Sequence, residues 1–135
     1  MNARSVTVRI PGSTSNLGSG FDTLGLALRI YNRVRVSKVA GQEVRIVSLL
    51  REENRRQATA MVTQAAACFF RQTGRPSFGI EVWLEGHVPI GRGLGASATA
   101  RVGILAALNR LSRADLKSEA LLGMATDLEG HPDNA

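Results

Sequence analysis

Residues 89–100 read PIGRGLGASATA, a glycine-rich stretch that runs directly into a helical pattern. Gly91, Gly93 and Gly95 alternate along it, and Ser97 follows as the apolar run begins. Because glycine has no Cβ, such a backbone can lie close against a bulky anion. The first N–H groups of the following helix lack partners within the helix and carry partial positive charge. The stretch therefore predicts a phosphate-binding loop, although a flexible loop followed by a helix has the same pattern.

The loop departs from the two common nucleotide-binding fingerprints. No lysine follows its last glycine, as the pattern G-x-x-x-x-G-K-[ST] requires, and its glycine spacing does not fit G-x-G-x-x-G. A nucleotide-binding protein with this loop therefore belongs to another lineage.

Length and composition are those of one soluble globular domain. The 135 residues are 44% hydrophobic and 21% charged, and a chain of this size buries roughly two-thirds of its unfolded surface. No apolar stretch reaches the ~20 residues of a membrane helix and no secretory signal pattern opens the chain, so we expect a cytoplasmic protein without a membrane partner. The single cysteine, Cys68, lies in an apolar run, where we expect a buried small hydrophobe.

The net charge of +6 comes from 15 arginines and two lysines against 11 acidic residues. Such a balance is typical of nucleic-acid-binding proteins. The arginines are scattered, however, aromatic residues make up only 4% of the chain, and Glu52 and Glu53 interrupt the longest basic cluster, residues 51–56. We therefore expect no nucleic-acid partner and attribute the charge to solvated faces and to attraction of an anionic nucleotide. An RNA-binding domain is the alternative, and salt-dependent RNA binding would test it.

Hydrophobic periodicity predicts a chain that mixes strands and helices. Apolar residues alternate in the expected strands, which cover residues 5–10, 33–39, 43–49 and 79–85. They recur at helical spacing in the expected helices, which cover residues 56–73, 97–111 and about 115–129.

The residues that end or connect these elements yield four local predictions. Pro11 and Gly12 should end the first strand. Gly41 and Gln42 should form a hairpin turn between the second and third strands. Gly74 should end the first helix, and Asp115 should cap the last one.

Two further segments identify the lineage of the loop. Residues 11–28 read PGSTSNLGSGFDTLGLAL, and residues 129–135 read EGHPDNA. Together with the central loop they resemble the GHMP kinases, named for their galactose, homoserine, mevalonate and phosphomevalonate members. Within that superfamily, N-L-G-x-G-F-D-x-L-G-L-A-L and E-G-H-P-D-N resemble the homoserine kinases in particular. Three ordered motifs in the first, middle and last parts of the chain make the resemblance specific.

The resemblance implies an α+β fold like the second domain of ribosomal protein S5, a mixed sheet packed with helices. Residues 1–135 would form the N-terminal, ATP-binding domain of a GHMP kinase, without the C-terminal domain of the family. We therefore expect a fragment or a truncated gene product that is poorly active alone. Apolar surface that the second domain would cover predicts self-association, so a homodimer is a further expectation.

The implied activity is ATP-dependent phosphorylation of L-homoserine to O-phospho-L-homoserine in threonine biosynthesis, with Mg²⁺. Another GHMP small-molecule kinase is one alternative, which a panel of substrates would distinguish. A noncatalytic nucleotide-binding module is a second, which would bind ATP without turnover.

By resemblance, the phosphates of ATP would lie against the loop and the first helical turn. The residues concerned are Pro89, Ile90, Gly91, Arg92, Gly93, Leu94, Gly95, Ala96, Ser97 and Ala98. Ser97 would also bind Mg²⁺. The family usually has two serines where this chain has Ala96 and then Ser97, and the resemblance assigns the metal to the second of them. A helix N-cap is the alternative for Ser97 and is compatible with that role. Glu129 is the expected second metal ligand. Its rivals are Asp127 as the ligand, or a merely solvated Glu129 at a helix end.

The resemblance assigns the substrate to the first and last motifs. Asn16, Asp22 and His131 would bind homoserine, whose ammonium or hydroxyl can donate to Asp22, while Asn16 can donate or accept. From the residues alone, Asn16 and Asp22 are typical of turns. Asp22 and Asn134 are the candidate catalytic residues, and Asp22 is the nearest candidate base for a reaction that need not require a strong one. Asn54 is the candidate for the adenine pocket.

Overall fold

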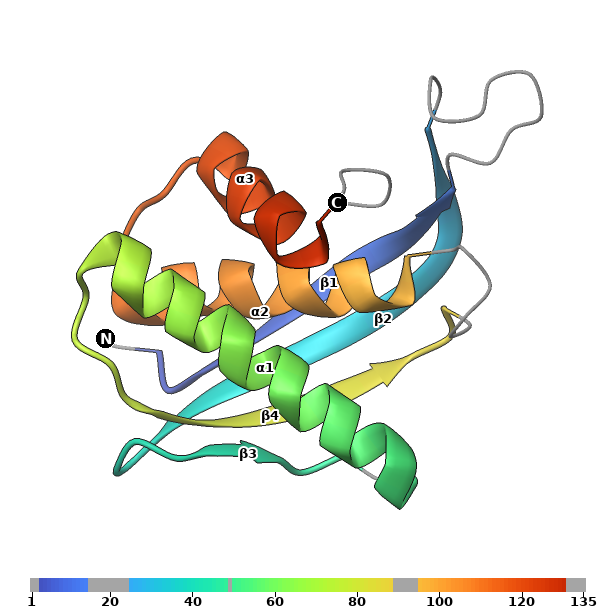
Figure 1. The fold of residues 1–135 in the computed structure, drawn as a ribbon. Coiled ribbons are helices and arrows are strands. Elements are labelled where there is room, and N and C mark those ends of the chain that lie inside the picture. The colour runs from blue at the N-terminus through green and yellow to red at the C-terminus, as the bar shows by residue number, and fades with distance from the viewer. Residues whose placement is uncertain (1–2, 15–24, 49, 89–94, 131–135) are drawn as a thin grey trace.

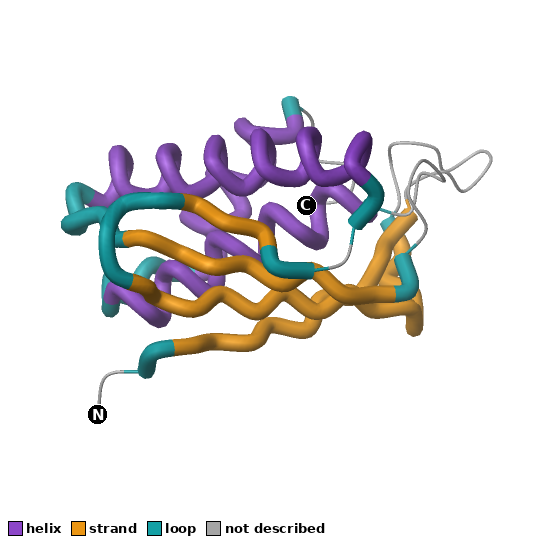
Figure 2. Tube along the Cα trace, turned by 90° about the horizontal axis from the view of Figure 1, so that it is seen from below, coloured by secondary structure: helices purple, strands orange, loops and turns teal. Residues whose placement is uncertain are grey.

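A computed structural model describes residues 3–14, 25–48, 50–88 and 95–130. Its elements, in chain order, are β1 (Ser5–Thr14), β2 (Leu26–Val39), β3 (Val44–Ile46), α1 (Glu52–Thr73), β4 (Gly79–Gly86), α2 (Ala96–Ser112) and α3 (Ser118–Glu129). The strands form one mixed sheet in the order β1-β2-β4-β3. Figures 1 and 2 show the helices together on one face of this sheet. The expected α+β class is therefore confirmed.

Alternating side chains give the sheet one apolar face. In register, Val34 of β2 lies opposite Val8 of β1 and Leu84 of β4, and Val36 lies opposite Val82. This face meets α2, which packs on β1 and β2, and α1, which packs on α2 and β3. The core so formed consists mainly of Val34, Val36, Val62, Ala65, Phe69, Ile80, Val82, Ile104, Leu105 and Leu108. Cys68, expected to be a buried small hydrophobe, is 5% exposed and free.

The opposite face of the sheet is left uncovered by the described helices (Figure 2). Arg9 and Arg33 lie opposite one another there, and both are exposed. The guanidinium of Arg9 lies 3.6 Å from the ring centroid of Tyr31, and that of Arg35 lies 4.2 Å from that of Trp83. Some of the basic surplus is thus held by aromatic rings rather than by carboxylates.

The predicted end of the first strand at Pro11 is wrong, because β1 continues through Pro11 and Gly12 to Thr14. Proline cannot donate a backbone hydrogen bond, but β1 is an edge strand, where the missing donor is tolerated. The register with β2 shifts between Pro11 and Ser13, so the ladder accommodates the proline with an irregularity rather than ending there.

The predicted hairpin at Gly41 is also wrong. Gly41 does adopt a positive φ of 84° in a tight turn, yet β4 lies between β2 and β3. β3 pairs in parallel with β4, with Val44 opposite Ile80, and the carbonyl of Gly41 accepts a hydrogen bond from the N–H of Gly79. In this central position, β4 buries Ile80 and Val82 completely.

Helix α1 begins at Glu52 instead of near residue 56 and ends, as predicted, at the left-handed Gly74. Glu52 and Glu53 lie in its first turn, where carboxylates favour the positive end of a helix. Arg55 donates from Nη1 to the carbonyl of Ile46 at 2.9 Å and from Nη2 to that of Ser48 at 3.1 Å. An arginine of the basic cluster therefore anchors α1 to the chain that follows β3.

Helix α2 approaches the sheet closely at Gly103, where an added Cβ would lie 2.6 Å from Val34 Cγ2 and 2.7 Å from Ile10 Cδ1. The predicted cap of the last helix at Asp115 is wrong, because α3 begins after Lys117 without a side-chain cap. Asn109 orders that connection instead, donating to the carbonyl of Leu116 at 3.0 Å and accepting from its N–H at 2.9 Å.

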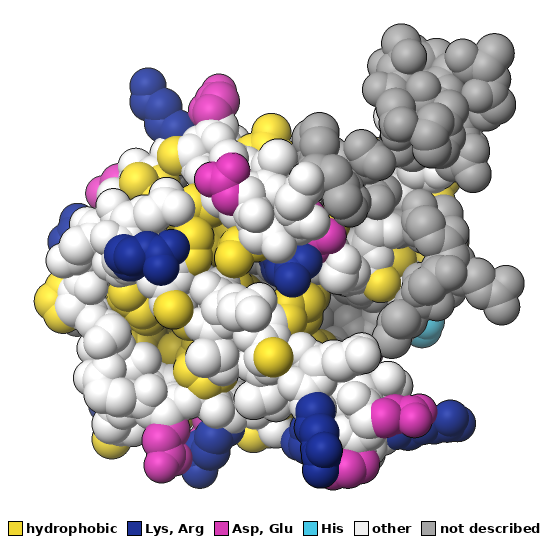
Figure 3. Space-filling view, in the orientation of Figure 1, with side chains coloured by type: hydrophobic (Ala, Val, Ile, Leu, Met, Phe, Trp, Pro, Cys, Tyr) yellow, Lys and Arg dark blue, Asp and Glu magenta, His cyan; other side chains and the backbone are white. Residues whose placement is uncertain are grey.

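Charged groups on the helix side are scattered. In Figure 3, Lys and Arg side chains of the described residues stand apart from one another and among Asp and Glu, around a surface where hydrophobic side chains emerge between the helices. None of the described helices is both long enough and apolar enough to cross a membrane.

Candidate functional site

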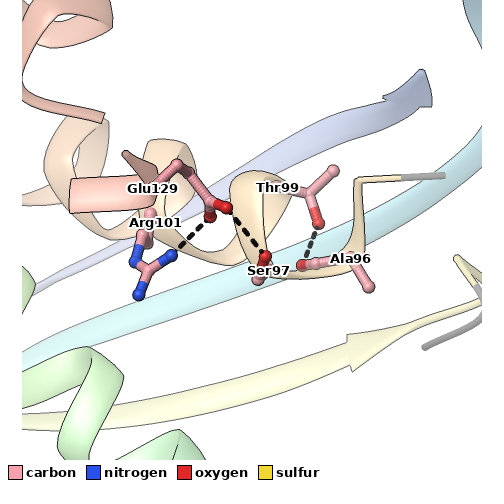
Figure 4. Close-up of polar contacts among 5 residues, drawn as sticks. All are labelled: Ala96, Ser97, Thr99, Arg101 and Glu129. Carbon is pink, nitrogen blue, oxygen red and sulfur yellow. Dashed lines mark hydrogen bonds and ion pairs between the residues drawn. The ribbon is translucent and has the colours of Figure 1, made fainter. Parts of the chain in front are cut away.

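The N-terminus of α2 is formed without a capping side chain. Gly95 occupies the cap position with φ 79°, a left-handed conformation that glycine adopts without strain. Interpretation of Ser97 as the N-cap is therefore wrong. Its hydroxyl instead donates to Glu129 Oε2 at 3.1 Å, whereas the hydroxyl of Thr99 donates to the carbonyl of Ala96 at 2.7 Å (Figure 4). The first turn of α2 thus presents Ser97 toward another helix.

A single side chain on β2 holds the two segments that flank residues 89–94. Asn32 donates from Nδ2 to Thr99 Oγ1 at 2.8 Å, and its Oδ1 accepts from the N–H of Val88 at 3.2 Å. Val88 lies just before those residues, and Thr99 lies in the first turn of the helix after them. Asn32 was missed by sequence reasoning. The available signal was a polar residue at the position where the alternation of Val34 and Val36 calls for an apolar one.

Glu129, the last residue of α3, reaches the first two turns of α2. Arg101 Nη1 lies 2.6 Å from Glu129 Oε1, and Ser97 donates to the other carboxylate oxygen. The side chains of Glu129 and Arg101 are only 8% and 16% exposed, so the interpretation of Glu129 as a solvated residue is wrong. Asp127, its rival as the metal ligand, is exposed. We call these three residues the Ser97–Arg101–Glu129 cluster (Figure 4).

Arg101 was also missed by sequence reasoning. It lies four residues after Ser97, and residues at that spacing on a helix are neighbours on one face. The spacing alone therefore placed a guanidinium beside the hydroxyl, although it could not show which carboxylate the two would share.

A cavity of about 720 Å³ opens beside the cluster. Ser97 and Arg101 line one end of it, and residues from β2, β4 and the first half of α1 line the rest. The α1 end combines apolar and amide side chains, namely Leu50, Asn54, Gln57, Ala58 and Met61. Asn54, Gln57, Ala58 and Met61 share helical spacing on α1, and of these only Asn54 was named from the sequence, as a candidate for the adenine pocket. A cavity of this size with a few polar groups is typical of a small-molecule site.

The structure describes only part of the predicted site. Gly95, Ala96, Ser97 and Ala98 form the start of α2, and Glu129 joins them from α3. The other predicted site residues lie outside the described residues: Asn16, Asp22, Pro89, Ile90, Gly91, Arg92, Gly93, Leu94, His131 and Asn134. Among the residues the structure does describe, no group of three or more His, Cys, Asp and Glu side chains could hold a metal.

Known proteins resemble this chain in sequence and in fold. The homoserine kinase of Trichormus variabilis is 40% identical over 132 residues, which cover 96% of this chain and 44% of the relative. The homoserine kinase of Clavibacter michiganensis is 42% identical over 135 residues, covering 97% and 43%. The crystal structure of homoserine kinase from Cytophaga hutchinsonii matches with a TM-score of 0.84 at 28% identity, covering 99% of this chain and 45% of that one.

The chain therefore spans less than half the length of the curated relatives it matches. The family model described as the GHMP kinases N terminal domain matches residues 60–135, more than half of the chain. This match includes the start of α2 and all three residues of the Ser97–Arg101–Glu129 cluster. The chain belongs to the GHMP kinase family.

Proposed function

We propose that this chain is the N-terminal part of a homoserine kinase, which transfers the γ-phosphoryl group of ATP to the hydroxyl of L-homoserine. Relatives called homoserine kinase match nearly the whole chain at about 40% identity. The observation that carries the proposal is the cavity of about 720 Å³ that reaches the N-terminus of α2 and is lined there by Ser97, whose hydroxyl donates to Glu129.

The two ends of the cavity suit the two ends of a nucleotide. At the α1 end, Leu50, Ala58 and Met61 supply apolar surface for a base, and Asn54 supplies an amide that can donate and accept hydrogen bonds. At the other end, the N-terminus of α2 favours anions through its dipole and its backbone N–H groups. We therefore propose that adenine lies against α1 and that the phosphates lie against residues 89–98.

The donor set fits a magnesium ion. Mg²⁺ prefers oxygen ligands and is usually held by one or two carboxylates with phosphates and water. Ser97 Oγ and Glu129 Oε2 lie 3.1 Å apart, and the carboxylate is nearly buried. We propose that these two residues hold the ion, which when bound would neutralise charge on the phosphoryl oxygens.

The acceptor side of the reaction falls on residues outside the described ranges. We propose that Asn16, Asp22 and His131 bind homoserine, and that Asp22 and Asn134 take part in catalysis. In the reaction, the hydroxyl oxygen of homoserine bonds to the γ-phosphorus as the bond to the ADP oxygen breaks. Asp22 would accept the hydroxyl proton. We further propose that the protein acts in the cytoplasm, that it forms a homodimer, and that its ligands are small molecules rather than nucleic acid.

Binding of ATP by the chain, measured by calorimetry with and without Mg²⁺, tests the nucleotide site. Ser97→Ala should weaken binding of the Mg²⁺–ATP complex by about tenfold or more, since it removes one hard ligand. Ser112→Ala is the matched control, because it removes a hydroxyl from the other end of α2, where Ser112 bonds the carbonyl of Leu108. A folded chain that binds no ATP contradicts the nucleotide site.

Phosphorylation of homoserine, mevalonate and galactose by the chain joined to a C-terminal GHMP domain tests the reaction. Homoserine-selective turnover that Asp22→Asn abolishes is the expected result. ATP binding without turnover of any of the three would favour a noncatalytic nucleotide-binding module instead.

A further inference from the structure

The guanidinium of Arg101 has more hydrogen-bond donors than its contact with Glu129 uses. Of its guanidinium donors, Nη1 bonds Glu129 Oε1 at 2.6 Å. Nε is buried without a hydrogen-bond partner within the described structure. A buried donor without a partner costs free energy, so its retention calls for an explanation. Arg101 also lines the cavity beside Ser97, which puts it within reach of a ligand there.

The charges of the Ser97–Arg101–Glu129 cluster cancel. Glu129 contributes one negative charge, Arg101 contributes one positive charge, and Ser97 is neutral. The guanidinium lies against the same carboxylate that would bind a cation, and both side chains are more than four-fifths buried. Water therefore screens this interaction less than it would at the surface. A divalent cation that approaches the cluster alone gains little net attraction and meets a fixed positive charge.

An anion in the cavity changes this balance. Phosphate oxygens would add negative charge beside both Arg101 and the Ser97–Glu129 oxygens, because the three residues adjoin one end of the cavity or one another. Arginine suits such a position, since its planar donors can serve a carboxylate and a phosphate at once. With phosphate present, the cluster and ligand together carry the surplus negative charge that a divalent cation requires.

We propose that Arg101 is a positioning residue that fixes the Glu129 carboxylate and makes cation binding conditional on the nucleotide. The Ser97–Glu129 pair then takes a divalent cation together with the phosphates and scarcely without them. This inference rests on the proposed function for the nucleotide, but the behaviour of the cation alone can be measured independently.

The test measures Mn²⁺ binding to the chain by electron paramagnetic resonance, first alone and then with saturating ATP. In the unsubstituted chain, Mn²⁺ should bind at least about tenfold more tightly with ATP than to chain or ATP alone. Arg101→Gln should bind free Mn²⁺ about tenfold more tightly, since one neighbouring unit charge changes ion binding by this order, and should bind the Mn²⁺–ATP complex more weakly. Arg101→Lys, which keeps the charge, should stay close to the unsubstituted chain for free Mn²⁺.

Arg110→Gln is the matched control, because it removes an exposed arginine from the last turn of the same helix. Equal free-Mn²⁺ affinity in Arg101→Gln and Arg110→Gln would overturn the proposal. If Arg101→Gln does not fold, the unsubstituted chain still decides, because free Mn²⁺ binding as tight as binding with ATP would also overturn it. Failure of ATP to bind at all contradicts the proposed function, while the free-Mn²⁺ comparison still tests Arg101.

Discussion

The two halves of helix α2 serve different purposes. In its second half, Ile104, Leu105 and Leu108 are fully buried against the sheet and neighbouring helices. In its first half, Ser97, Thr99 and Arg101 make polar contacts with side chains or backbone at particular distances. Burial of an aliphatic side chain contributes about 1.5–3 kcal/mol without regard to direction. A hydrogen bond contributes about 0.5–1.5 kcal/mol but specifies geometry. One half of the helix therefore supplies stability, and the other supplies position.

The largest change in stability should follow from Ile104→Ala in the apolar half. The substitution leaves a cavity in a fully buried site and should lower the free energy of unfolding by about 2–5 kcal/mol, measured by urea denaturation. ATP affinity per folded molecule should not change. Leu122→Ala on α3 is the control, because Leu122 is 47% exposed. Equal losses in the two variants would contradict the stabilising role of the buried half of α2.

An intermediate effect is expected from Asn32→Ala, which removes a hydrogen-bond partner of Thr99 in the first, polar half of α2. The substitution leaves the buried Thr99 hydroxyl without one donor and the N–H of Val88 without its acceptor, so the free energy of unfolding should fall by about 1–3 kcal/mol. Hydrogen exchange at the Val88 amide should accelerate more than exchange in the core of α2. A double-mutant cycle with Thr99→Val should show coupling of about 0.5 kcal/mol or more. Additive losses would mean that Asn32 and Thr99 act separately.

The smallest effect is expected outside α2, on the uncovered face of the sheet. Arg35→Gln removes an exposed guanidinium stacked on Trp83, and the free energy of unfolding should change by no more than about 0.5–1 kcal/mol. Fluorescence of the single tryptophan should shift because its ring loses that neighbour. A loss as large as that of Asn32→Ala would show that this face contributes to stability as α2 does.

Sequence reasoning succeeded where the determining interactions are local. The alternation of Ile80, Val82 and Leu84 predicted β4, since a strand in a one-sided sheet has to repeat every two residues. The prediction of a hairpin at Gly41 was wrong because local residues determine the turn but not the strand with which β3 pairs. That strand is β4, which lies far along the chain. Propensity and spacing contain no direct record of that competition.

The same distinction holds for the site. The glycine pattern and Ser97 pointed to the start of α2, and the resemblance added Glu129, which the structure places beside Ser97. Asn32 and Arg101 escaped because their partners come from distant elements, such as Val88 and Glu129. The sequence showed that Asn32 is a polar residue in an apolar pattern, but it did not show which groups Asn32 would bind.

The insertion of β4 between β2 and β3 has a consequence for how the chain folds. β1 and β2 are consecutive and can pair as soon as both have left the ribosome. β3 must wait for β4, because its only strand partner within the described sheet is made after the whole of α1. Pairs such as Val36 and Val82 close a long loop, which raises the entropic cost of the transition state and slows folding. During synthesis, β2 therefore exposes an unpaired edge until Gly86 emerges, a period in which binding by a chaperone would protect the nascent chain from aggregation.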